Sequence, residues 1–317
     1  MPKKRQKIAF LFPGQGAQYP GMGKDFYESF PAAKEIFEEA DEFLSMHFSK
    51  LIFEGPEQEL TLTKNSQMAI YITSSAMLRT LESQFPHIVP TVCAGLSLGE
   101  YTALFASGRV SFTEGLALVQ ARGEYMNDAC EKTRGTMRVV LGMDDKALAE
   151  LLPENVWVAN VNCPGQVVIA GLVAAMPEAE EILKAKGAKR VLPLDVSGAF
   201  HTPLMQTAQE RLKPQLLSTD LKDSKIDFVM NVPGDYVHDH AHIRNYLIEQ
   251  VVSPTRWKSG IEAMMQKGIE IYFEIGPGKA LTGMNRKIGA PGVSINIEKV
   301  TDLDNALLKE LYAVVEG

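Results

Sequence analysis

The sequence predicts an α/β protein built as one large domain with a smaller domain inserted into it. Short apolar segments typical of buried strands alternate along the chain with longer segments of helical periodicity. A Gly-x-Ser-x-Gly sequence at residues 95–99 joins one such strand to a helix. Residues 136–196 follow the order strand, helix, strand, strand, helix, strand, which is the ferredoxin-like arrangement.

The large domain is predicted over residues 1–130 and 201–317, and it is therefore discontinuous. Its clearest strand is the apolar run 8–12, which ends at the loop Pro13–Gln18. The other elements predicted for this domain are a helix at about 63–83, a strand at 89–94, helices at 100–106 and about 113–129, and a buried strand at 269–275.

The inserted domain is predicted over residues 131–200. Asp144 is a favourable N-cap for its first helix, and Gly187 suits the end of the second. The turn signal Cys163-Pro164-Gly165 separates its two central strands. In order, the predicted elements are a strand at 136–142, a helix at 144–152, strands at 156–162 and 166–170, a helix ending at 186 and a strand at 189–196.

Composition excludes several classes of protein. The chain has 317 residues, 45% of them hydrophobic and 22% charged, which is ordinary for a globular protein with a sizeable core. Its net charge of −7 argues against nonspecific binding to nucleic acid or to an anionic membrane. No apolar run approaches the 18 residues of a membrane span, and the run 8–12 is too short for a signal peptide. Three widely spaced cysteines without a C-x-x-C pair favour reduced thiols and a cytoplasmic location.

Ser97 is the candidate nucleophile, at the centre of Gly95-Leu96-Ser97-Leu98-Gly99. In a nucleophile elbow the strand-to-helix turn is so tight that only glycine fits on both sides of the serine. The turn exposes the hydroxyl at the helix N-terminus, where the N–H of Leu98 can stabilise an oxyanion. Such an elbow is typical of an α/β-hydrolase-like sheet, although glycines also surround serines in ordinary turns.

His201 is the candidate base, because it lies at the junction between the last strand of the inserted domain and a new helix. A solvent-facing histidine would fit that position equally well. The order of serine and histidine differs from the hydrolase order, and no carboxylate is an obvious partner, so a backbone carbonyl could orient the imidazole. Arg122 shares an apolar helix face with Leu118 and Met126, where it either extends to solvent or binds an anion such as a substrate carboxylate.

Three patterns resemble ligand sites without meeting their requirements. His238-Asp239-His240-Ala241-His242 suggests a metal, yet no other cysteine or histidine pattern supports it, so no functional metal is expected. Gly276-Pro277-Gly278-Lys279 lacks the spacing of a phosphate-binding loop. Gly14-Gln15-Gly16 lacks the third glycine of a dinucleotide fingerprint, since position 19 is tyrosine.

Several ordered segments resemble the malonyl-CoA:acyl-carrier-protein transacylases of fatty-acid synthesis and their acyltransferase relatives in polyketide synthesis. The resemblance covers nearly the whole chain. The segments that carry it are Phe12–Gln18, Gly95–Glu100, Gln120–Gly123, Asn160–Gln166, Gly198–His201, Gln250–Trp257 and Glu274–Gly278.

The resemblance implies transfer of malonyl from malonyl-CoA to acyl carrier protein through an acyl-serine, without a cofactor. A monomer is expected, although the sequence has no feature that fixes the oligomeric state. Ser97 would be acylated, His201 would be its base, and the backbone carbonyl of Gln250 would orient the imidazole. The N–H groups of Gln15 and Leu98 would form the oxyanion hole. The implied substrate contacts are Arg122 for the malonyl carboxylate, Gln67 in the same pocket, Phe200 against an α-methyl group, and Asn160, Asn162, Lys189 and Arg190 for CoA.

Two positions depart from the family pattern: Leu96, where many members have histidine, and Arg138, where small or apolar residues are usual. An acidic carrier protein also requires a local basic patch on this net-negative chain. The candidates are one cluster of Lys184, Lys186, Lys189 and Arg190, and another of Lys279, Arg286 and Lys287. The alternatives are a stand-alone acyltransferase for polyketide synthesis, a Ser-His thioesterase, and a carrier-binding protein without catalysis.

Overall fold

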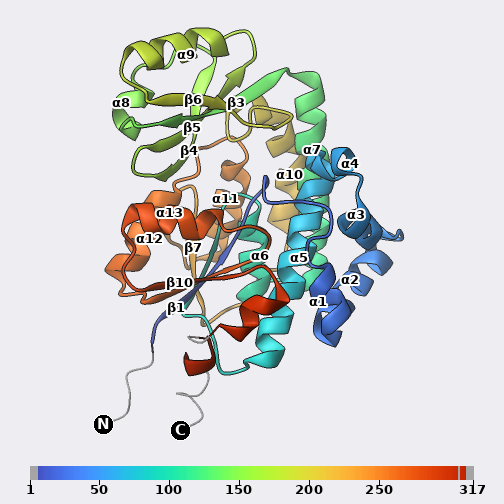
Figure 1. Ribbon diagram of the computed structural model, residues 1–317. Helices are drawn as coiled ribbons and strands as arrows, with labels where there is room; N and C mark the ends of the chain where they lie inside the picture. The colour runs from blue at the N-terminus through green and yellow to red at the C-terminus, as the bar shows by residue number, and fades with distance from the viewer. Residues whose placement is uncertain (1–5, 306–307, 312–317) are drawn as a thin grey trace.

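The computed structural model describes residues 6–305 and 308–311, which form two β-sheets with helices packed around them (Figure 1). The larger sheet has the strand order β10-β9-β1-β2-β7-β8. Neighbouring strands pair in parallel, except that the short edge strand β8 is antiparallel to β7. The bounds are β1 Ile8–Phe12, β2 Val92–Gly95, β7 Asp227–Met230, β8 Asp235–Tyr236, β9 Ile271–Ile275 and β10 Val293–Ile297.

Helices cover both faces of this sheet, which explains why β1 is buried along its whole length. Phe10 and Phe12 of β1 belong to the main core, whereas Ala9 and Leu11 face a second core. The helices are α1 Lys24–Ser29, α2 Pro31–Leu44, α3 Phe48–Glu54, α4 Glu57–Thr61, α5 Thr63–Gln84, α6 Gly99–Ala106, α7 Phe112–Lys132, α10 Gln206–Ser218, α11 His240–Gln250, α12 Trp257–Gln266 and α13 Ala280–Ile288.

The smaller sheet is antiparallel, with the strand order β4-β5-β3-β6. It lies at the top of Figure 1 and encloses a separate hydrophobic core under two helices. The elements are β3 Gly135–Leu141, α8 Asp145–Ala149, β4 Val156–Cys163, β5 Gln166–Leu172, α9 Met176–Ala185 and β6 Arg190–Pro193. The two sheets and their helices confirm the prediction of a mixed α/β protein.

Some predicted boundaries are wrong by a few residues, for local reasons. The strand expected from Val89 begins only at Val92, because Pro90 has no N–H to donate to a neighbouring strand. The last strand of the small sheet ends at Pro193 rather than at residue 196, although Leu194 N still donates to the Met137 carbonyl oxygen of β3. Helix α7 begins at Phe112, one residue early, because Ser111 and Glu114 form a capping box at its start.

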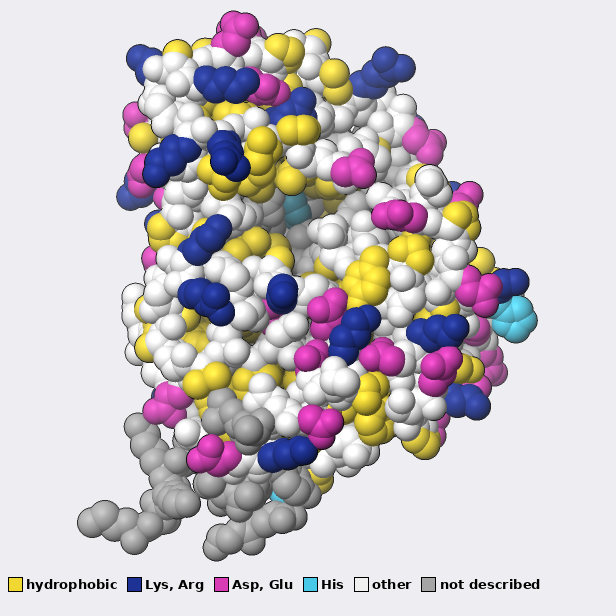
Figure 2. Space-filling model, in the orientation of Figure 1, with side chains coloured by type: hydrophobic (Ala, Val, Ile, Leu, Met, Phe, Trp, Pro, Cys, Tyr) yellow, Lys and Arg dark blue, Asp and Glu magenta, His cyan; other side chains and the backbone are white. Residues whose placement is uncertain are grey.

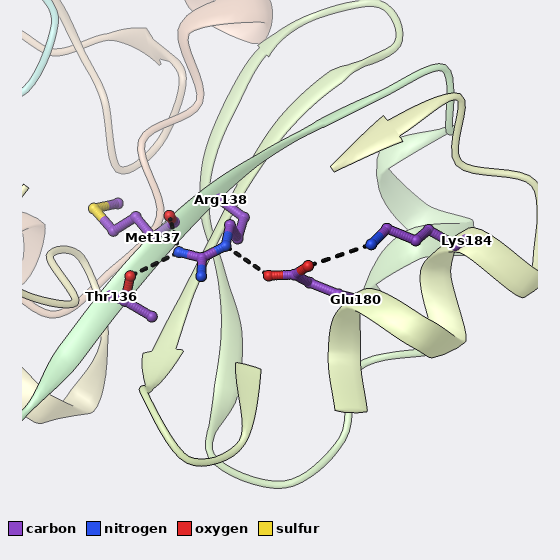
Figure 3. A network of polar contacts seen from close by, with 5 residues as sticks. All are labelled: Thr136, Met137, Arg138, Glu180 and Lys184. Carbon is purple, nitrogen blue, oxygen red and sulfur yellow. Dashed lines mark hydrogen bonds and ion pairs between the residues drawn. The ribbon is translucent and has the colours of Figure 1, made fainter. Parts of the chain in front are cut away.

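Arg138 of β3 forms an ion pair within the small sheet and its helix α9 (Figure 3). Its Nε lies 2.7 Å from Oε1 of Glu180, and its Nη1 donates to Thr136 Oγ1 and to the Met137 carbonyl oxygen. Glu180 also faces Lys184 at 3.4 Å. Burial alone would raise the pKa of Glu180. The contacts with Arg138 and Lys184 lower it by more, so the pKa lies below its ordinary value. Arg138, the residue that departs from the family pattern, therefore links strand β3 to helix α9 through Glu180.

Among the described residues, no helix combines the length and the apolar character that crossing a bilayer requires.

Candidate active site

Ser97 lies in a sharp turn between β2 and α6, with a backbone φ of 52°. A Cβ added at Gly95 would overlap the backbone of Gly99, and one added at Gly99 would overlap the carbonyl oxygen of Phe12. Both positions therefore require glycine, and the turn is held tightly against β1. This geometry places the Ser97 side chain at the N-terminus of α6, as the sequence pattern predicts for an elbow.

His201 and Gln250 complete a chain of contacts that starts at Ser97. The Ser97 Oγ atom is 2.8 Å from His201 Nε2, and His201 Nδ1 is 2.8 Å from the carbonyl oxygen of Gln250. Gln250 is the last residue of α11, where carbonyl groups have no partner within the helix. Because a carbonyl only accepts, Nδ1 carries the proton and Nε2 is left free to accept from the serine hydroxyl.

The environment keeps His201 neutral. Burial lowers the pKa of His201 to about 4, and the charge of Arg122 acts in the same direction. Hydrogen bonds with backbone groups of Gln250 and Ser253 oppose this shift without cancelling it. At neutral pH the imidazole can therefore accept a proton from Ser97.

Arg122 of α7 lies beside the serine and is 1% exposed. Its Nη2 donates to Ser97 Oγ at 3.0 Å and to Gln250 Oε1 at 2.9 Å, and its Nη1 donates to Gln67 Oε1 at 2.5 Å. Its Nε has no hydrogen-bond partner. Burial lowers the pKa of Arg122, while Tyr101 and Glu100 oppose that shift. Since all three acceptors are uncharged, this buried cation can still pair with an anion next to Ser97.

The loop that follows β1 packs against the elbow. A Cβ added at Gly14 would overlap the carbonyl oxygen of Leu96, so Gln15 of the same loop lies close to the serine turn. The Gln15 side chain is 3.4 Å from Thr63 Oγ1 at the start of α5. Leu98 is the N-cap residue of α6 and is fully buried. Leu96 is partly buried and packs against the second core.

Two buried residues that the sequence analysis did not single out contact the elbow. Asn231, directly after β7, accepts from Ser97 N through Oδ1 at 2.6 Å and donates from Nδ2 to the Gly95 carbonyl oxygen at 2.7 Å. Glu100 accepts from Asn231 N and from Gln250 Nε2, both at 2.5 Å. Burial raises the pKa of Glu100 to about 8 against the opposing effects of these hydrogen bonds and of Arg122. In the sequence, the signal that could have indicated Glu100 is that it is the one charged residue of the segment 99–105.

The other predicted contact residues lie around this centre. Phe200 is buried next to His201 in the chain. Asn160 of β4 donates from Nδ2 to Thr255 Oγ1 at 2.6 Å, and Asn162 is buried with an unpartnered Oδ1. Lys189 and Arg190 are exposed at the start of β6.

A hollow between the two parts of the molecule has a histidine visible at its floor (Figure 2). Lysine and arginine side chains gather to the left of this hollow, over the small sheet and the helices below it (Figures 1 and 2). Lys184, Lys186, Arg286 and Lys287 of the two candidate basic clusters are exposed. Lys287 of α13 donates to Gln166 Oε1 of β5 at 3.0 Å, so the second cluster adjoins the small sheet.

The three clustered histidines face different carboxylates. His238 is 3.7 Å from Asp227, His240 is 3.5 Å from Asp223, and His242 is 3.3 Å from Asp239. Within residues 6–305 and 308–311, no group of three or more histidine, cysteine or acidic side chains is arranged to hold a metal ion.

Comparison with known proteins gives consistent matches along the chain. The model of the acyl transferase domain family matches residues 9–290. The malonyl CoA-acyl carrier protein transacylase of Bacillus subtilis is 46% identical over 288 residues, which are 89% of this chain and 90% of that protein. Its counterpart in Escherichia coli K12 is 37% identical over 89% of this chain and 93% of its own length.

Solved structures agree with these matches. The malonyl CoA-acyl carrier protein transacylase of Clostridium perfringens superimposes with a TM-score of 0.92 at 36% identity, over 98% of this chain and all (100%) of that one. A malonyl-transacylase in complex with its type II polyketide-synthase acyl-carrier protein gives a TM-score of 0.91 at 34% identity, over 96% and 100% of the two chains.

Proposed function

The chain belongs to the acyl transferase domain family, and we propose that it transfers malonyl from malonyl-CoA to the phosphopantetheine thiol of acyl carrier protein. This activity supplies fatty-acid synthesis. The observation that carries the proposal is the Ser97–His201 pair at 2.8 Å next to Arg122, a buried cation whose acceptors are all uncharged. A hydrolase of neutral esters needs only Ser97 and His201, whereas an enzyme that binds malonyl also needs a cation, here Arg122, for the free carboxylate.

The reaction proceeds in two steps that use the same groups. His201 Nε2 takes the Ser97 proton, Oγ attacks the malonyl thioester carbonyl, and the N–H groups of Gln15 and Leu98 bind the oxyanion. The carbon–sulfur bond then breaks, and the CoA thiolate leaves with the proton from His201. The carrier thiol attacks the malonyl-serine ester by the reverse path, which gives ping-pong kinetics. Loss of one oxyanion donor typically costs about 10²–10³ in rate.

The remaining contacts are proposed to select the substrate. Arg122 binds the malonyl carboxylate, and Gln67 holds the guanidinium in place. Phe200 limits space next to the malonyl α-carbon. Asn160 and Asn162 of β4, with Lys189 and Arg190 at the start of β6, are proposed to contact the CoA arm. The basic side chains beside the hollow suit an acidic carrier protein.

The two sheets support a proposal for the domain organisation. The six-stranded sheet is proposed to be an α/β-hydrolase-like domain of residues 1–130 and 201–317, into which a ferredoxin-like domain of residues 131–200 is inserted. No step of the reaction calls for a cofactor or a metal. A monomer in the cytoplasm remains the expectation from the sequence.

The acylation rate should stay level from neutral pH down to about pH 5 and then fall tenfold per pH unit below about pH 4. His201 acts as a base only when neutral, and burial lowers its pKa to about 4. Burst kinetics with malonyl-CoA measure this profile, with melting temperatures recorded at each pH to exclude unfolding. An inflection near the ordinary histidine value of about 6.5 would contradict the assignment.

The proposed function is tested by mass spectrometry of the intact protein after brief mixing with malonyl-CoA. We expect a malonyl adduct that survives in buffer and disappears when holo acyl carrier protein is added. An adduct lost equally fast to water would indicate the thioesterase, and no adduct would indicate a binding protein without catalysis.

A polyketide-synthesis acyltransferase is the second candidate, because one structural match is bound to a polyketide-synthase carrier. The same adduct can be offered in parallel to a carrier protein of fatty-acid synthesis and to one of polyketide synthesis. Faster discharge to the fatty-acid carrier supports the main proposal, and faster discharge to the polyketide carrier supports the second.

A further inference from the structure

Glu100 lies beneath the nucleophile, where the exposed fraction of its side chain is 0%. Neither oxygen forms an ion pair; both accept hydrogen bonds from neighbours that reach Ser97. We infer that Glu100 is a positioning residue, which fixes both peptide groups of Ser97 through Asn231 and Gln250. This inference rests on the proposed role of Ser97 as the acylated residue.

The first connection runs through Asn231. Glu100 Oε1 accepts from the backbone N–H of Asn231 at 2.5 Å, and the Asn231 side chain accepts from Ser97 N at 2.6 Å. The same side chain donates to the Gly95 carbonyl oxygen at 2.7 Å. Asn231 therefore bridges the two sides of the turn, and Glu100 anchors the backbone that carries it. The connection holds the Leu96–Ser97 peptide while Ser97 adopts a φ of 52°.

The second connection runs through the side chain of Gln250. Glu100 Oε2 accepts from Gln250 Nε2 at 2.5 Å, and the same Nε2 donates to the Ser97 carbonyl oxygen at 3.0 Å. That carbonyl belongs to the peptide whose N–H is Leu98 N, the proposed oxyanion donor. Since a peptide is planar, fixing its oxygen also fixes the direction of its N–H. Glu100 thereby orients the oxyanion hole without contacting the substrate.

The hydrogen-bond pattern calls for a group that accepts at both ends. Both oxygens of a carboxyl group can accept, even when one of them carries the proton that the raised pKa of Glu100 favours near neutral pH, whereas an amide has one acceptor oxygen and an NH₂ group that only donates. In Glu100→Gln, the new NH₂ faces either the N–H of Asn231 or the NH₂ of Gln250, so one of the two connections is lost. The substitution changes neither the shape of the side chain nor any group that the proposal places on the substrate.

Glu274 provides a matched control elsewhere in the fold. It is 1% exposed at the end of β9, and its oxygens accept from Leu281 N at 3.0 Å and from Thr282 N at 2.6 Å. Burial also raises the pKa of Glu274. Glu274→Gln removes an equivalent buried acceptor, but the backbone groups that it holds belong to α13 rather than to the elbow.

The test measures two reactions of Ser97: malonylation by malonyl-CoA, and inactivation by methanesulfonyl fluoride, which requires no malonyl site. In Glu100→Gln we expect both rate constants to fall by roughly 10²-fold, the cost of a small misplacement of reacting groups. The malonyl-CoA concentration at half-maximal burst rate should not change. Glu274→Gln should lower the melting temperature and leave both rates unaltered.

A Glu100→Gln variant that is destabilised but keeps both rate constants would overturn the inference. If Glu100→Gln does not fold, Asn231→Ala removes the first connection alone. Unchanged rate constants in Asn231→Ala would also overturn the inference. If both fold, the double variant should lose less than the product of the single losses, because the two residues act through one serine. A wild-type protein that reacts with methanesulfonyl fluoride but not with malonyl-CoA would instead contradict the proposed function.

Discussion

Replacing Ser97 by alanine is expected to lower malonyl transfer by roughly 10⁶-fold, the scale seen when the nucleophile of a serine protease is removed. The Oγ atom forms the covalent bond to malonyl, and no other described hydroxyl lies between His201 and Arg122 in the same way. The variant should give no malonyl adduct in the mass spectrum and no discharge to the carrier. Steady-state transfer to holo acyl carrier protein measures the size of the loss.

The backbone provides the control for this substitution. Serine and alanine both carry a Cβ, so the strain at φ 52° is the same in the two proteins and the melting temperature should change little. His201→Ala should cost a comparable factor, and Ser97→Ala/His201→Ala should be no slower than the worse single variant, since the pair acts as a unit. A malonyl adduct on Ser97→Ala would show that another residue is acylated.

The elbow was predictable from the sequence because its requirements are local. A side chain at Gly95 would overlap Gly99, and one at Gly99 would overlap the adjacent strand β1. Both requirements are therefore visible in the pentapeptide itself. Arg122 was visible as a cation on an apolar helix face. The partner of His201 was not visible in any motif, because a backbone carbonyl has no residue type; only the family resemblance indicated Gln250.

The residues that support the elbow were harder to find because their contacts are distant in sequence. Asn231 reaches Ser97 across 134 positions, since β7 lies beside β2 in the sheet. Strand adjacency of this kind follows from the topology and not from any pattern near residue 231. The ion pair of Arg138 with Glu180 spans 42 positions, so an unusual arginine on a strand gave no indication of its partner on α9.

Replacing Arg122 by alanine should lower the preference for malonyl over acetyl by roughly 10²- to 10⁴-fold, the equivalent of the 3–5 kcal/mol lost when one member of a buried ion pair is removed. The malonyl carboxylate would then enter a site that contains Gln67 and Gln250 but no cation. Acetyl has no carboxylate, so its transfer does not depend on that pair. Competing transfer from malonyl-CoA and acetyl-CoA measures the ratio.

The ratio is the appropriate measure because Arg122 also donates to Ser97 Oγ, so its loss affects the serine whatever the acyl group. Arg122→Lys keeps the charge but not the planar fork, and it should retain part of the preference. Arg122 also lowers the pKa of His201, so the pH profile of acetyl transfer should move upward in Arg122→Ala. An unchanged malonyl preference would mean that another group binds the malonyl carboxylate. An unchanged pH profile of acetyl transfer would mean that the charge of Arg122 does not lower the pKa of His201.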